Sequence, residues 1–220
     1  MTVRVKVCGI TSREDASCAF SRGADYIGII VDIAGSPRSV TIGAASLITS
    51  VFKPVVVLME APAAAIVPAL DRLQPSAVQL VGHYEPDDIL RLKQACDTDV
   101  WMTVHVPPAG GSVRDLERRI VRMHTAGLDA IVLDTLVAGQ KGGTGRTCDW
   151  KTAADVVSSV PLPVFLAGGL TPDNVADAAA AVRPYGVDVS SGVEASPGHK
   201  DPEKVARFIK QSRSVGAAAT

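Results

Sequence analysis

Two side chains that can move protons each stand at the end of an apolar run of the sequence. Cys8 follows residues 3–7, where every second position is a valine, and Asp134 follows the apolar stretch 130–133. A thiolate base facing a carboxylic acid is a workable pair for moving protons within a sugar. Each residue alone also has a simpler interpretation, Cys8 as a small buried hydrophobe and Asp134 as a loop cap.

Small residues that let a backbone approach an anion follow the last two apolar runs, and a third such segment, GGTG, occupies 142–145. Loops of this kind bind phosphate through backbone N–H groups, although ordinary turns have a similar composition. The segment KGGTGRT lacks the pattern of a nucleotide P-loop, so we expect it to cover a phosphorylated substrate rather than bind ATP. The residues predicted to bind phosphate are Gly143, Gly145, Gly168, Gly169, Ser190, Ser191 and Gly192.

Three further polar residues lie close to the ends of apolar runs. Arg38 follows a Ser-Pro turn and is predicted to form charge-assisted bonds to a substrate carboxylate, or else to lie solvated in its loop. His83 and His105 are expected to be structural or surface residues, because lone histidines usually are.

Composition excludes several classes of protein. The chain has 220 residues, 47% of them hydrophobic, and a net charge of -1, which fits a globular domain without the basic excess of a nucleic-acid binder. Its four cysteines are scattered without ligand spacing, so we expect neither a metal site nor a disulfide scaffold, and a reducing cytoplasm fits best. We find no signal-peptide pattern and no uninterrupted apolar stretch long enough for a membrane span.

Apolar strand-like runs alternate with segments of helical period along the chain. Eight such pairs within 1–211 predict a single-domain α/β fold, a (β/α)8 TIM barrel, and residues 212–220 are expected to be a disordered tail. Catalytic side chains of such barrels gather at the carboxyl ends of strands, so Cys8 and Asp134 are predicted to face one another across the mouth. The predicted strands are 3–8, 25–31, 54–59, 76–81, 99–104, 128–133, 163–167 and 186–189. The predicted helices are 12–22, 42–51, 62–73, 86–96, 112–125, 149–158, 172–182 and 201–211.

The chain resembles the phosphoribosylanthranilate isomerase family of the tryptophan pathway over nearly its whole length. The resemblance is carried by ordered motifs, which are most specific in combination. They include VKVCGIT at 5–11, SPRSV at 36–40, VQL at 78–80, LDT at 133–135, GGTG at 142–145, LAGGLTPDNV at 166–175 and GVDVSSGVEASPGHKD at 186–201.

This resemblance implies a cofactor-free Amadori rearrangement of N-(5-phosphoribosyl)anthranilate to its 1-amino-1-deoxyketose. Asp134 would be the general acid that opens the ribose ring, and Cys8 the general base that removes the proton from C2. Arg38 would bind the anthranilate carboxylate, and Gln79 and Asp188 would also contact the substrate. The implied state is a monomer or a homodimer that binds neither nucleic acid nor membrane.

Three positions depart from the family pattern, all toward the aryl end of the implied pocket. The usual histidine after VQL is Val81, the segment before Ser36 has no aromatic residues, and Cys148 stands where a phenylalanine is usual. These departures motivate an alternative, a related Amadori isomerase that acts on a different N-substituted phosphoribosylamine. A noncatalytic phosphosugar-binding barrel is the remaining alternative, although such a binder has no need of both Cys8 and Asp134.

Overall fold

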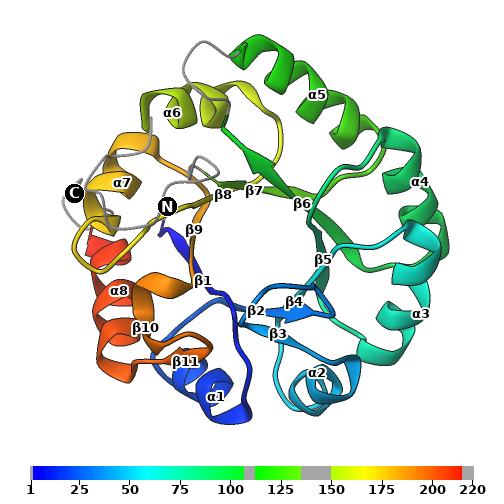
Figure 1. The fold of residues 1–220 in the computed structure, drawn as a ribbon. Helices are drawn as coiled ribbons and strands as arrows, with labels where there is room; N and C mark the ends of the chain where they lie inside the picture. Colours follow the sequence, from blue (N-terminus) through cyan, green and yellow to red (C-terminus); the bar gives the residue numbers. More distant parts are fainter. Residues whose placement is uncertain (1, 107–111, 135–149, 215–220) are drawn as a thin grey trace.

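Eight parallel strands close into a barrel in the computed structural model, which describes residues 2–106, 112–134 and 150–214 (Figure 1). The strands pair in the order β1-β9-β8-β7-β6-β5-β4-β2, and a further pairing between β1 and β2 closes the ring. The predicted (β/α)8 barrel is therefore confirmed. Its strands are β1 (Arg4–Val7), β2 (Tyr26–Val31), β4 (Val55–Met59), β5 (Ala77–Leu80), β6 (Asp99–His105), β7 (Ala130–Asp134), β8 (Val164–Ala167) and β9 (Gly186–Val189).

Helices cover the outside of the barrel, so the strands are buried on both faces and read as continuous apolar runs. Strand β4 is the clearest case, because all five of its residues are buried. No described helix is both long enough and apolar enough to cross a lipid bilayer. The helices are α1 (Arg13–Ser21), α2 (Ile42–Thr49), α3 (Ala63–Leu73), α4 (Pro86–Ala95), α5 (Val113–Thr125), α6 (Trp150–Ser159), α7 (Val175–Val182) and α8 (Pro202–Ser214).

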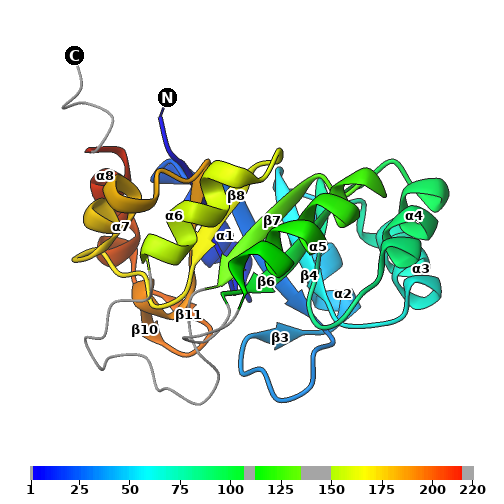
Figure 2. The ribbon, with the colours of Figure 1, turned by 90° about the horizontal axis from the view of Figure 1, so that it is seen from above.

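Four short elements lie outside the predicted pattern. Strand β3 (Ser39–Val40) pairs with β2, and a single 3-10 turn, η1 (Ser191–Val193), follows β9. The strands β10 (Glu194–Ser196) and β11 (His199–Lys200) then form an antiparallel hairpin. Figure 2 shows β3 and this hairpin at the same end of the barrel.

Residues 212–214 are helical, so the predicted disordered tail is wrong for these three residues. Helix α8 continues to Ser214, and Ser212 is completely buried with its hydroxyl donating to the Phe208 carbonyl at 2.8 Å. Arg213 Nη2 donates to the Gly23 carbonyl at 2.6 Å. Small polar residues carry no apolar period, so their burial was invisible in the sequence. The rest of the predicted tail lies outside the described residues.

The barrel interior is apolar near the amino ends of its strands. Tyr26, Trp101 and Phe165 lie there, with ring centroids 5.3 Å apart for Tyr26 and Trp101 and 4.8 Å apart for Trp101 and Phe165. Gly186 makes room for them, because a Cβ at that position would lie 2.4 Å from Phe165 Cε1. This aromatic plug leaves the opposite, carboxyl end of the barrel to polar side chains.

Candidate active site

Cys8 lies in the barrel interior beside a buried ion pair. Lys6 Nζ donates to Asp188 Oδ1 at 3.0 Å, and the two residues are direct neighbours in the β1–β9 pairing. Lys6 has no solvent exposure, and only 4% of Cys8 is exposed. A Cβ at Gly28 would lie 2.8 Å from Cys8 Sγ and 3.1 Å from Lys6 Nζ. Glycine on the adjoining strand therefore gives the thiol and the ammonium group a shared space.

Burial and nearby charge act in opposite directions on this thiol. Burial raises the pKa of Cys8, whereas the positive charges of Lys6 and Lys200 lower it, and burial has the larger effect. Burial alone would lower the pKa of Lys6, but the charges of Asp188 and Cys8 raise it, so Lys6 stays charged. Cys8 is thus a thiol at rest, with a permanent cation placed to stabilise its thiolate.

Asp134 ends strand β7, which is separated from β1 by β8 and β9 around the ring. Its side chain is 29% exposed, and His105 Nδ1 lies 3.9 Å from Asp134 Oδ2. The two candidate catalytic side chains thus stand at the carboxyl ends of strands on separate parts of the ring. His105, expected to be a structural or surface residue, is 68% exposed and lies beside this candidate acid, because β6 and β7 pair these two positions directly.

Gln79, on strand β5, has a buried side-chain oxygen. Its Nε2 donates to Thr103 Oγ1 at 2.9 Å, whereas its Oε1 is buried without a hydrogen-bond partner in the part of the chain that the structure describes. A buried oxygen left unpaired is costly unless a ligand or water satisfies it.

Val81, two residues after Gln79, lines a pocket beside α4 together with His83. His83 pairs with Glu85 at the surface, as expected of a surface histidine.

The loop after β8 is held in a defined shape by Asn174. Gly168 and Gly169 have φ values of +95° and +65°, which favour glycine. Asn174 Nδ2 donates to the Gly169 carbonyl at 3.1 Å, and the Thr171 N–H donates to Asn174 Oδ1 at 2.8 Å. Such a loop keeps its backbone groups in fixed directions.

The loop after β9 packs directly on the loop after β8. A Cβ at Gly192 would lie 2.0 Å from the Leu170 carbonyl oxygen, so the two backbones are in contact there. Ser190 Oγ is buried and has no hydrogen-bond partner among the described side chains and backbone. Ser191 begins the turn η1. The structure therefore brings five of the predicted phosphate-binding residues together, while Gly143 and Gly145 lie outside the described residues.

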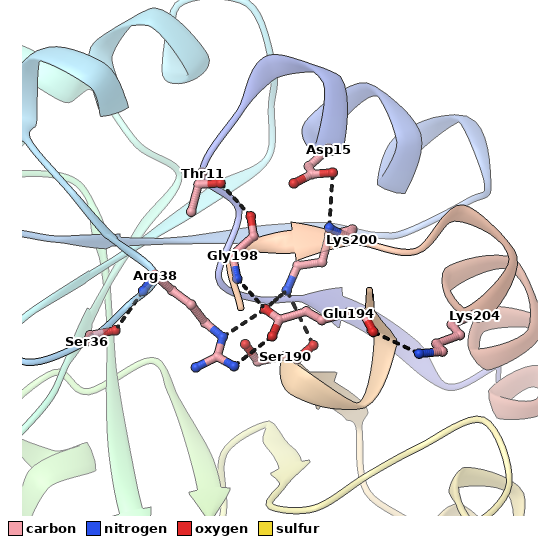
Figure 3. Close-up of polar contacts among 9 residues, drawn as sticks. All are labelled: Thr11, Asp15, Ser36, Arg38, Ser190, Glu194, Gly198, Lys200 and Lys204. Carbon is pink, nitrogen blue, oxygen red and sulfur yellow. Dashed lines mark hydrogen bonds and ion pairs between the residues drawn. The ribbon is translucent and has the colours of Figure 1, made fainter. Parts of the chain in front are cut away.

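Arg38 does not stand solvated in its loop but binds a buried carboxylate (Figure 3). Its Nε and Nη2 donate to the two carboxylate oxygens of Glu194 at 2.8 and 2.6 Å. Lys200 Nζ donates to the same carboxylate at 2.8 Å and to the Ser190 carbonyl at 3.3 Å. Burial alone would raise the pKa of Glu194, but the bonds from Arg38 and Lys200 hold it at about 2.

Glu194 and Lys200 are site residues that the sequence analysis did not single out. Both stand within the hairpin segment GVEASPGHKD. Their charges, next to the predicted phosphate loop, are the feature of the sequence that could have marked them as site residues. No three His, Cys, Asp or Glu side chains within the described ranges gather in a way that could hold a metal ion.

Known proteins are similar to this chain in both sequence and fold. A family model described as N-(5'phosphoribosyl)anthranilate (PRA) isomerase matches residues 5–211. The N-(5'-phosphoribosyl)anthranilate isomerase of Methanocella arvoryzae is 45% identical over 216 residues, covering 96% of this chain and 98% of the relative. Monomers of the dimeric phosphoribosylanthranilate isomerase from Thermotoga maritima superpose with a TM-score of 0.81 at 32% identity, covering 96% and 99% of the two chains.

One further solved structure carries a bound molecule. It is a phosphoribosylanthranilate isomerase in complex with reduced 1-(o-carboxyphenylamino)-1-deoxyribulose 5-phosphate. It superposes with a TM-score of 0.79 at 31% identity, covering 96% of this chain and 99% of that one.

Proposed function

Because the chain belongs to the N-(5'-phosphoribosyl)anthranilate isomerase family, we propose that its barrel mouth performs the isomerisation that gives the family its name. The substrate is the aminoaldose N-(5'-phosphoribosyl)anthranilate and the product is 1-(2-carboxyphenylamino)-1-deoxyribulose 5-phosphate, in tryptophan biosynthesis. The observation that carries this function is the match over residues 5–211, which includes the candidate base Cys8 and the candidate acid Asp134.

The reaction needs one acid and one base acting on the same sugar. In the first step Asp134 donates its proton to the ribose ring oxygen, the nitrogen lone pair forms a double bond to C1 as the C1–O bond breaks, and the substrate becomes a protonated Schiff base. In the second step the Cys8 thiolate takes the proton from C2, and the electrons of that bond form an enolamine. The enolamine then gains a proton at C1 and loses the proton of its C2 hydroxyl, which gives the ketone, so C1 is reduced and C2 is oxidised within one molecule.

The remaining site residues bind and orient the substrate. Arg38 binds the anthranilate carboxylate, because a guanidinium group suits a carboxylate. Gly168, Gly169, Ser190, Ser191 and Gly192 bind the phosphate, supported by the close packing of their two loops and by the buried Ser190 hydroxyl, which has no hydrogen-bond partner among the described residues. Gln79 and Asp188 contact the sugar hydroxyls, Gln79 through its Oε1, for which the described part of the chain offers no partner.

Isomerisation is measured by the fall in anthranilate fluorescence when purified protein is mixed with N-(5'-phosphoribosyl)anthranilate. We expect saturable turnover. A folded protein that binds this substrate without converting it would be a phosphosugar-binding barrel instead. If the protein turns over only another N-substituted phosphoribosylamine, it is the related Amadori isomerase that the departures from the family pattern, Val81 among them, suggested.

We also propose that the chain works in the cytoplasm, as a monomer or a homodimer. The described cysteines, Cys8, Cys18 and Cys96, are free thiols, which suits a reducing compartment. The T. maritima relative is dimeric, and monomers of it have a solved structure. Analytical ultracentrifugation over a concentration series distinguishes the two states.

A further inference from the structure

A single buried carboxylate joins two loops at the mouth of the barrel. Glu194 lies at the start of β10 and is 8% exposed, yet it binds Arg38 from the loop after β2 and Lys200 from β11 (Figure 3). The Gly198 N–H also donates to Glu194 Oε1, at 3.4 Å. Every one of these partners is a donor, so this carboxylate is fully engaged within the protein.

The contacts with Glu194 set the direction of the Arg38 guanidinium group. Two of its nitrogens, Nε and Nη2, are taken by the carboxylate, which leaves Nη1 for another partner. The aliphatic part of Arg38 lies over Gly9, where a Cβ would come within 2.7 Å of Arg38 Cδ and 2.8 Å of Ser190 Oγ. The Arg38 side chain is therefore held beside Gly9, the chain neighbour of Cys8, and beside Ser190 of the predicted phosphate loop.

Glu194 also sets the charge of this cluster. With its pKa at about 2, it is ionised throughout the neutral range, so two cations and one anion leave one net positive charge. Without the carboxylate, Arg38 and the buried Lys200 would face each other as like charges. One net positive charge beside a free donor edge suits one carboxylate of a ligand.

We propose that Glu194 is a positioning residue that aims Arg38 at the anthranilate carboxylate and, through Lys200, ties that contact to the Ser190 end of the phosphate loop. The proposal rests on the proposed function, which gives Arg38 this ligand. Glu194 makes no contact with the substrate and transfers no proton. Its effect is confined to the carboxylate end of the ligand.

Two probes separate this role from a merely structural one. One is reduced 1-(o-carboxyphenylamino)-1-deoxyribulose 5-phosphate, and the other is the same molecule without the carboxyl group. Calorimetric dissociation constants are measured for the unchanged protein, Glu194→Gln, Arg38→Ala and the double variant. A glutamine can accept through one oxygen only, so it holds one donor of Arg38 in place of two.

We expect Glu194→Gln to raise the dissociation constant of the carboxylated probe at least about tenfold, the scale of a charge-assisted pair of hydrogen bonds. The dissociation constant of the other probe should rise less than about threefold. In the Arg38→Ala background the same change should raise the dissociation constant of either probe less than about threefold. In turnover, KM should rise with little change in kcat. Lys93→Met, which breaks an ion pair with Asp129 at the amino end of the barrel, is the control and should leave both probes unaffected.

Loss of a buried anion beside Lys200 can also unfold the chain, so the combined change Glu194→Gln with Lys200→Met is made in parallel. It removes the buried cation together with its partner and should show the same selective loss. Equal weakening of both probes by the variants, or an undiminished cost in the Arg38→Ala background, overturns the positioning role alone. If the unchanged protein binds the two probes equally, Arg38 does not read the carboxylate, and its assigned role falls together with this inference.

Discussion

Opposing effects of burial and nearby charge set the pKa of the Cys8 thiol. Burial raises its pKa, while Lys6 lowers it from a position fixed by the ion pair with Asp188. Lys6 is held charged, so its contribution does not vary over the neutral range. The fraction of thiolate, and with it the rate of proton removal from C2 in the proposed mechanism, therefore depends most on the Lys6 cation, with a smaller contribution from Lys200.

Replacing Lys6 tests that dependence. In Lys6→Met the lowering contribution is lost, so the pKa of Cys8 rises further and the thiolate fraction at a given pH falls. We expect the rising limb of kcat/KM against pH to move upward by about one pH unit, with about tenfold lower kcat/KM at pH 7. Arg4→Met, an exposed change on the same strand, is the control. An unmoved limb in Lys6→Met would contradict the role of Lys6.

Glu194 gives a second prediction at this scale, on stability. Its pKa is about 2 in the folded chain against an ordinary value of 4.5. A lowered carboxyl pKa contributes stability that is present above pH 4.5 and is lost as pH falls toward 2. The contribution is at most about 3 kcal/mol. Urea unfolding at pH 6 and pH 3 should show a smaller loss for Glu194→Gln than for the unchanged chain, and equal losses would contradict it.

The sequence predicted Cys8, Asp134 and Arg38 as site residues because each stands within a recognisable local motif. It did not predict the partner of Arg38, since Glu194 is 156 residues away and only the closed ring brings them together. The burial of Lys6 was hidden for a related reason. In a barrel both faces of a strand are covered, so a lysine on the inner face looks like an ordinary polar position in the alternation.

At the scale of elements, the loops after β8 and β9 act as one unit. Asn174 shapes the first loop, and Gly192 of the second lies against the Leu170 carbonyl. Because backbone meets backbone, neither loop can shift without moving the other. The proposed phosphate site is therefore a property of two packed loops rather than of one glycine motif.

A methyl group at Gly192 should separate these loops. Gly192→Ala places a Cβ where the Leu170 carbonyl oxygen lies, and overpacking of this kind costs about 1–3 kcal/mol. We expect KM to rise at least about tenfold, with a smaller effect on kcat, measured in the fluorescence assay. The matched control is Gly43→Ala, because a Cβ at Gly43 meets only Thr41 Oγ1 at 3.8 Å. Equal KM values for the two variants would show that the contact is unimportant.

Periodicity predicted the long elements well and the short ones not at all. The eight barrel strands and the helices between them match the predicted ranges to within a few residues. Strand β3 and the β10–β11 hairpin were missed because two or three residues are too few to show a period. The hairpin matters for function, since it carries Glu194 and Lys200.

At the scale of the whole molecule, the barrel interior is divided along its axis. Tyr26, Trp101 and Phe165 fill the amino end with aromatic rings, while Lys6, Cys8, Asp188, Gln79 and Asp134 occupy the carboxyl end. The aromatic plug closes one end of the ring, so a substrate enters only from the other. Ring closure then brings Cys8 and Asp134 from separate strands to the same end of the barrel, as the proposed mechanism requires.

The most direct test of this account is the rate of ketose formation at saturating N-(5'-phosphoribosyl)anthranilate by the unchanged chain, Cys8→Ala and Asp134→Asn. Each variant should fold, as shown by circular dichroism, and still bind the reduced product analogue. We expect kcat to fall at least about a hundredfold in each, the scale of losing general acid or base assistance. A folded variant whose kcat stays within about threefold of the unchanged chain would contradict the role given to that residue.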